Sequence, residues 1–275
     1  MTQSLQNTIC VIGGSNSIKA EGWTTELAKS LPNGATVLNE SVGAVHGIMG
    51  WYRLSALKQL KPGDVVLWEY ALNDQNYIDH RGSDPALLLR FCEHVIRLCH
   101  IRGLRLIPMI FATRTVAALP EMTRYRRDLR LLFGHYKLDY LDVSEEILKK
   151  LDRPRVPKFI YSDEMHYKGD SFVVRFIANR VLELIRFGAG AVADDAPLFS
   201  TGLIEGQIVT TFDKGRMEKF SNSRISIDCW TPQPDGTPVS IQVESGPFRL
   251  VGVVMLCTPF GAPPVMVGAC WACSE

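Results

Sequence analysis

The pattern of apolar and polar residues over the first 190 residues alternates between two kinds of segment. Short runs rich in β-branched residues predict strands near residues 8–12, 35–38, 65–69, 105–111 and 139–142. Longer segments with apolar residues at helical spacing predict helices near residues 18–29, 51–60, 85–101, 121–133, 144–151 and 170–187. Such alternation favours a mostly parallel sheet with helices on both faces, joined by right-handed crossovers. The sequence therefore predicts a three-layer α/β/α domain over residues 1–190.

The pattern changes after a linker of small, acidic and proline residues that includes Gly188 and Pro197. Beyond it, β-type runs alternate with turns that contain Gly, Pro and Asp. These runs cover residues 207–212, 224–230, 239–243, 248–255 and 265–269. The sequence thus predicts a small all-β domain over residues 195–275. One expectation is a β-sandwich that binds a glycan or mediates dimerisation. The other is that it only covers one side of the first domain.

Three candidate groups follow the first three predicted strands. Ser15 comes after Gly13 and Gly14 at the end of the first strand and precedes a predicted helix. At such a position, free backbone N–H groups can face a developing oxyanion. Gly43 after the second strand offers a further backbone N–H, and Asn73 after the third strand offers a side-chain amide. In open α/β sheets the ligand lies at the carboxyl ends of the strands, where these groups are expected to meet.

A second element of acyl-transfer chemistry lies just before the last helix of the first domain. Asp163 and His166 are three residues apart in a predicted loop. In a turn, this spacing lets a carboxylate hold one imidazole nitrogen while the other nitrogen faces a nucleophile. Ser15 is the predicted nucleophile. Ser17 is the competing serine, but it lies further from the strand end.

In this order, the segments that contain Gly13 to Ser17, Gly43, Asn73 and Asp163 to His166 resemble the conserved blocks of the SGNH (GDSL-like) hydrolase family. The resemblance covers roughly residues 8–187 and implies a flavodoxin-like parallel sheet. It implies that Ser15, His166 and Asp163 form a catalytic triad, with Ser15, Gly43 and Asn73 in the oxyanion hole.

The chain departs from the family pattern at two positions. Gly14 stands where the family usually has Asp, and Ala71 stands where the third block usually has Gly. Neither change removes a reacting atom, because the nucleophile, base, orienting acid and oxyanion donors are all present.

Composition narrows the functional classes further. The chain has 275 residues, of which 46% are hydrophobic and 21% are charged, as in an ordinary soluble globular protein. A net charge of +1 gives no general electrostatic reason to bind nucleic acid or an anionic membrane. No apolar run reaches the ~18 residues of a membrane span, and residues 1–7 lack the pattern of a secretory signal. A cytoplasmic protein is therefore expected.

The cysteines also favour a cytoplasmic protein. The seven cysteines are an odd number with scattered spacing, which favours reduced thiols over a disulfide framework. Cys270 and Cys273 form one C-x-x-C pair without a second ligand pair, so no zinc site is predicted. No metal and no organic cofactor is implied by the residues or by the family resemblance.

The resulting prediction is a serine-dependent hydrolase of acyl esters. The expected substrate is a small-molecule or glycan ester that carries a short acyl group such as acetyl, by analogy with the family. Two alternatives stay open at this point. One is an O-acyltransferase that modifies a polysaccharide or glycan, and the other is a non-catalytic glycan-binding protein on the same scaffold. The sequence also leaves open whether the protein forms a homo-oligomer.

Overall fold

The computed structural model describes residues 8–32, 35–119, 121–153, 155–188, 196–199, 216–221 and 226–231. The chain divides into two compact units, Met1–Glu205 and Gly206–Glu275.

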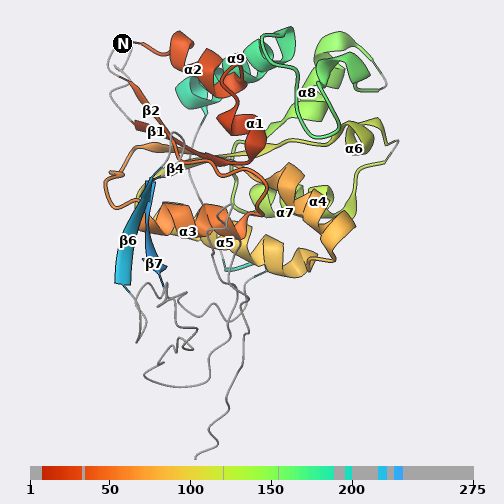
Figure 1. The fold of residues 1–275 in the computed structure, drawn as a ribbon. Helices are drawn as coiled ribbons and strands as arrows, with labels where there is room; N and C mark the ends of the chain where they lie inside the picture. Colours follow the sequence, from red (N-terminus) through yellow and green to blue (C-terminus); the bar gives the residue numbers. More distant parts are fainter. Residues whose placement is uncertain are drawn as a thin grey trace, which may run out of the picture. The chain divides into compact units, whose positions relative to one another are not determined.

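The first unit is built on a parallel sheet of five strands (Figure 1). The strands are β1 (Thr8–Gly13), β2 (Thr36–Asn39), β3 (Val65–Glu69), β4 (Arg105–Ile110) and β5 (Leu141–Asp142). Their order is β2-β1-β3-β4-β5, which is the flavodoxin-like order of a doubly wound sheet. The predicted α/β class and strand positions are therefore confirmed. β3 is buried along its whole length, as expected for a parallel strand covered on both faces.

Helices cover both faces of this sheet. They are α1 (Ser15–Ile18), α2 (Trp23–Ser30), α3 (Ile48–Ala56), α4 (Ala71–Arg81), α5 (Pro85–Ile101), α6 (Arg114–Ala118), α7 (Arg124–His135), α8 (Val143–Leu151) and α9 (Phe172–Phe187), with a 3-10 turn η1 at Lys158–Ile160. In Figure 1, α2, α8 and α9 lie on one side of the sheet, and α3, α5 and α7 lie on the other.

Side chains of β1 alternate between the two cores that these helices cover. Ile9 and Val11 belong to the core with α2, α8 and α9, whereas Cys10 and Ile12 belong to the core with α3, α5 and α7. This alternation follows from the two-residue period of a strand. It is the basis of the three layers that the sequence predicts.

Two helices were not among the predicted elements. α6 is short, and α4 follows directly where the prediction had a strand running into Asn73 and Asp74. The segment of α4 is polar over much of its length, so it carries no apolar stripe that would indicate a helix. Its end has a clear signal, because Gly82 adopts φ +66° at the C-cap. The predicted helix over residues 18–29 is divided into α1 and α2.

In the second unit the structure describes an antiparallel hairpin of β6 (Arg216–Ser221) and β7 (Ser226–Thr231). β7 corresponds to the predicted run over residues 224–230, whereas β6 was not predicted. The predicted runs over residues 207–212, 239–243, 248–255 and 265–269 lie outside the described residues. An all-β domain of residues 195–275, and its role, stay predictions.

In the part of the chain that the structure describes, no helix is both long enough and apolar enough to cross a membrane. Three cysteines whose side chains the structure describes are buried free thiols: Cys10, Cys92 and Cys99. Burial raises the pKa of the Cys10 thiol to about 12, which keeps it protonated.

Candidate active site

Ser15 lies at the switch point of the sheet. β1 has β2 on one side and β3 on the other, so the strand order reverses its direction at β1. A crevice forms at this place in doubly wound sheets, outside the carboxyl ends of the strands. β1 ends at Gly13, and Ser15 is the first residue of α1.

The structure brings Ser15, His166 and Asp163 together in one hydrogen-bonded chain. The Nε2 atom of His166 lies 2.8 Å from Ser15 Oγ. The Nδ1 atom of His166 lies 2.9 Å from both Asp163 Oδ1 and Asp163 Oδ2. These distances allow one imidazole nitrogen to take a proton from the serine while the carboxylate holds the other nitrogen. The geometry is the one expected from the sequence spacing.

Asp163 also shapes the turn that carries His166. Its Oδ1 atom accepts hydrogen bonds from the backbone N–H groups of Met165 (2.8 Å) and His166 (2.9 Å). Partial burial opposes ionisation of this carboxyl group. The hydrogen bonds from Met165 and His166 outweigh that effect and hold the pKa of Asp163 below its ordinary value. The same side chain therefore folds the turn and stays available as an anion beside the imidazole.

The backbone of Gly43 packs directly against Ser15. A Cβ atom added to Gly43 would lie 3.3 Å from Ser15 Cβ, which is closer than most side chains can approach. Among the described residues, the N–H groups of Ser15 and Gly43 donate no hydrogen bond to the protein. The two N–H groups that the sequence singles out therefore belong to residues that pack together, and both keep their hydrogen-bonding capacity unused.

Asn73 lies in the first turn of α4, next to Gly14. Its Nδ2 atom donates a hydrogen bond of 2.7 Å to the backbone oxygen of Val45. An amide NH₂ group carries two hydrogens, so the second one is left for another acceptor. Its role as an oxyanion donor stays a prediction. A Cβ atom added to Gly14 would overlap Asn73 Oδ1 and lie 2.9 Å from Asn73 Cγ.

This contact limits what can stand at residue 14. Gly14 has φ −86° and ψ −159°, a conformation that any residue can adopt, so glycine is not needed for its backbone angles. A side chain here would compete for space with the amide group of Asn73. Ala71, the second departure, is a buried residue at the start of α4, where alanine favours the helix more than glycine does.

α4 also fixes the segment after Gly43. Besides the bond from Asn73 to Val45, the hydroxyl group of Tyr77 donates to the backbone oxygen of Ala44 (2.8 Å). The Asp74 Oδ1 atom accepts from the N–H group of Gly47 (2.6 Å). Ala44 has φ +58°, an uncommon value for a residue with a side chain, and these bonds compensate for its cost.

The sequence patterns do not identify Asp74 as a site residue, although it follows Asn73 directly. Its side chain is fully buried, and its Oδ2 atom accepts a hydrogen bond of 2.6 Å from the Tyr125 hydroxyl group. Burial raises the pKa of Asp74 to about 7, although the bonds from Tyr125 and Gly47 oppose the shift. Asp74 therefore ties α4 to both α7 and the Gly43 segment.

Glu69, at the end of β3, is a second buried acid that the sequence reading missed. Its Oε2 atom accepts hydrogen bonds from Ser17 Oγ (2.7 Å) and from the N–H group of Gly14 (3.1 Å). Burial raises the pKa of Glu69 to about 8 against these two bonds. Ser17 is itself fully buried, with its hydroxyl group engaged by Glu69. The geometry therefore favours Ser15 over Ser17 as the reactive serine.

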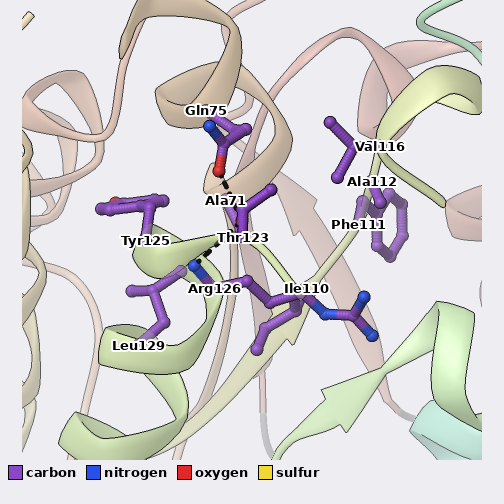
Figure 2. Close-up of a pocket in the computed structure, with 10 residues that line it drawn as sticks. All are labelled: Ala71, Gln75, Ile110, Phe111, Ala112, Val116, Thr123, Tyr125, Arg126 and Leu129. Atoms are coloured by element: carbon purple, nitrogen blue, oxygen red, sulfur yellow. Dashed lines mark hydrogen bonds between the residues drawn. The ribbon is translucent and has the colours of Figure 1, made fainter. Parts of the chain in front are cut away.

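Two hollows lie near these elements, and neither is lined by Ser15 or His166. One is a cavity of about 10 Å³, the size of one water molecule. It lies between the starts of α4 and α7 and the end of β4 (Figure 2). Its polar lining includes Gln75 and Thr123, whose side chains form a hydrogen bond of 2.7 Å. A larger depression of about 500 Å³ is lined by Arg114, Thr115, Ala118, Leu119 and Lys158.

The larger depression adjoins the turn of Asp163. The backbone N–H of Arg114 donates to the Glu164 backbone oxygen (2.9 Å), and the Arg114 guanidinium lies 3.3 Å from the Glu164 carboxylate. Glu164 also accepts from the N–H group of Thr115 at 2.8 Å.

Among the described residues, no cluster of His, Cys, Asp and Glu could hold a metal ion.

Replacing Gly14 tests the contact with Asn73. We expect Gly14→Ala to lower the free energy of unfolding by about 1–3 kcal/mol, because the added methyl group overlaps a buried amide. Gly14→Asp, which restores the usual residue of the family, should cost more because it also buries a charge. Urea unfolding measures both changes. Gly134→Ala is the control, since a Cβ at Gly134 in α7 meets nothing within 4 Å. A Gly14→Asp protein as stable as the wild type would contradict this reading.

The buried Glu69 predicts how stability depends on pH. Its pKa is near 4.5 in the unfolded chain and about 8 in the folded protein, so between these values the folded state binds more protons. Stability must then fall as pH rises through this window. In Glu69→Gln this contribution is absent. Thermal unfolding of the two proteins from pH 4.5 to 8 should show the wild type losing stability relative to the variant. A difference that does not change with pH would show that Glu69 ionises freely.

Neither a family model nor a curated protein sequence matches this chain. Its fold is similar to that of several solved structures. The protein YXIM from Bacillus subtilis matches with a TM-score of 0.53 and 21% identity over 67% of this chain, which spans 58% of that protein. The acetyl xylan esterase AlAXEase matches with a TM-score of 0.53 and 16% identity, over 64% of this chain and 98% of its own.

A protein from Parabacteroides merdae that is described as a GDSL-like lipase also matches. The TM-score is 0.53 and the identity is 14%, over 66% of this chain and 95% of the other. At such identities the similarity concerns the fold. The order of the five strands and the placement of Ser15 after β1 agree with it. The first unit of this chain therefore has the α/β/α fold of the SGNH (GDSL-like) hydrolases.

Proposed function

We propose that this protein is a serine-dependent hydrolase of acyl esters. The observation that carries the proposal is the chain of hydrogen bonds from Ser15 Oγ through the His166 imidazole to the Asp163 carboxylate. A serine without a catalytic role would not need a histidine beside it that is itself held by a carboxylate. Here, two segments 151 residues apart in the sequence meet with both imidazole nitrogens engaged.

The first half of the reaction forms an acyl-enzyme. Ser15 Oγ attacks the acyl carbon of the ester while His166 Nε2 accepts the hydroxyl proton. The tetrahedral intermediate then collapses, the bond to the leaving alcohol breaks, and His166 gives that alcohol its proton. Asp163 holds the imidazole in the correct tautomer and stabilises its positive charge during these steps. In the second half, water attacks the acyl group on Ser15 in the same manner.

The oxyanion of the tetrahedral intermediate needs fixed donors. The N–H groups of Ser15 and Gly43 are suited to this role because they are unused and lie beside the nucleophile. The second amide hydrogen of Asn73 is the third donor. Its first hydrogen bond, to Val45, fixes the plane of the amide group before the substrate binds. Removal of one such donor typically costs about 100- to 1000-fold in kcat.

The proposed substrates carry a short acyl group, with acetyl on a carbohydrate as the first candidate. Support comes by analogy from the acetyl xylan esterase whose fold this chain shares. Hydrolysis and transfer to a glycan hydroxyl group share the acyl-enzyme and differ only in the acceptor of the second step. The hydrogen-bonded chain at Ser15 favours either enzyme over a non-catalytic glycan-binding protein.

A covalent probe tests the proposal. We expect a fluorophosphonate to label the wild type on the peptide that contains Ser15, because the probe reacts with a serine activated by its base. Ser15→Ala should abolish labelling and lower kcat for a small activated ester by at least about 10⁴-fold. Ser17→Ala is the matched control and should keep its label if it folds. Mass spectrometry reads the label, and circular dichroism checks folding. Labelling that survives in Ser15→Ala and disappears in Ser17→Ala would identify the other serine as the nucleophile.

A further inference from the structure

Asn16, the residue after Ser15, reaches across the fold to the turn that carries His166. Its Nδ2 atom donates a hydrogen bond of 2.9 Å to the backbone oxygen of Met165. Its Oδ1 atom accepts a hydrogen bond of 2.9 Å from the backbone N–H of Tyr167. The side chain is 4% exposed, so its bond to Tyr167 is shielded from water and its bond to Met165 is partly shielded. One amide group therefore binds the backbone on both sides of His166.

The turn of His166 has its own internal support. The backbone N–H of Ser162 donates to the oxygen of His166 (2.9 Å), and Tyr161 pairs with Tyr167 as an isolated antiparallel bridge. The side chain of Asp163 caps the turn from within. These bonds fix the shape of the turn and the pairing of Asp163 with His166. They do not fix the distance from the imidazole to the serine.

That distance depends on contacts between the turn and the segment after β1. Lys19 provides two, from its Nζ atom to the backbone oxygen of Tyr167 (3.0 Å) and to Ser162 Oγ (3.4 Å), but Lys19 is partly exposed and has a long, flexible side chain. The N–H group of Asp170 provides another, to the oxygen of Glu21 (3.1 Å), further from Ser15. Asn16 is adjacent to Ser15 in sequence and buried, and its short side chain makes two bonds of 2.9 Å. It is therefore the most rigid of these connections.

We propose that Asn16 is a positioning residue that sets the register between the nucleophile and the base. Its amide group aligns the backbone of residues 165–167 with the start of α1, and so holds His166 Nε2 within hydrogen-bond reach of Ser15 Oγ. The inference rests on the proposed function. Its physical basis is the sensitivity of proton transfer to geometry, since a misplacement of about 1 Å can cost about 100-fold in rate.

The alanine variant removes both bonds at once. Asn16→Ala is expected to lower kcat for a small activated ester by about 10- to 100-fold while KM changes by less than about twofold. The amide does not contact the substrate, so its loss affects proton transfer and not binding. The rate of fluorophosphonate labelling should fall by the same factor as kcat, because labelling needs the same activation of Ser15.

A control variant separates positioning from stability. Thr24 is buried in α2, and its hydroxyl group donates to the backbone oxygen of Ser17 (3.1 Å). Thr24→Val removes this buried bond to α1 without touching the turn of His166. It should lower the melting temperature and leave kcat within about twofold of the wild type. A loss of kcat in both variants that follows their loss of stability would overturn the proposal, as would an unchanged kcat in Asn16→Ala.

Asn16→Leu carries the test if the alanine variant does not fold, because leucine has nearly the shape of the amide side chain and leaves no cavity. It removes the bonds to Met165 and Tyr167 without burying a charge. It should lose kcat, again with little change in KM, and wild-type kcat in this variant would overturn the proposal. A wild-type protein that fails to react with the probe would instead refute the proposed function. The two failures are therefore distinguishable.

Discussion

The burial of β1 on both faces is the constraint on which the arrangement of the site depends. Residues 9–12 are fully buried between two helical layers, so no reactive side chain can be placed along the strand. The first position at which a polar group can meet the substrate is the turn after Gly13. Ser15 occupies it, at the switch point of the sheet. Because β1 itself is buried, the nucleophile lies in the turn that follows it.

The same edge of the sheet contains an unusual amount of buried polarity. Glu69 and Asp74 are both fully buried, and this burial raises the pKa of both carboxyl groups. Each carboxyl group accepts backbone N–H bonds from the loops that hold Ser15 and Gly43. Their burial is costly, and the hydrogen bonds offset part of this cost. The same bonds help to hold the Ser15 and Gly43 loops in place.

Much of the fold and the outline of the site follow from local patterns. β-branched runs indicate β1 and β3, and the three-residue spacing of Asp163 and His166 indicates a turn with an oriented imidazole. Other features depend on contacts that no local pattern records. α4 lacks an apolar stripe because only its first turn is buried. Glu69 could not be recognised, since a glutamate at a strand end is ordinarily exposed.

Long-range contacts explain the remaining differences. The amide group of Asn73, in the first turn of α4, occupies the space that a side chain at Gly14 would need. Asn16 joins segments 149 residues apart in the sequence, and its neighbours along the chain give no sign of this. Both residues act by filling or bridging the space between two loops. Such roles become visible only when the strands have been placed in order.

The central claim is that Ser15 carries the acyl group during turnover. Its most direct test is a reaction with p-nitrophenyl acetate that is quenched in acid within the first turnover and analysed by peptide mass spectrometry. The account predicts one acetyl group on the Ser15 peptide in the wild type and in Ser17→Ala, and none in Ser15→Ala. Release of p-nitrophenol without an acetyl group on Ser15 at any time would contradict it.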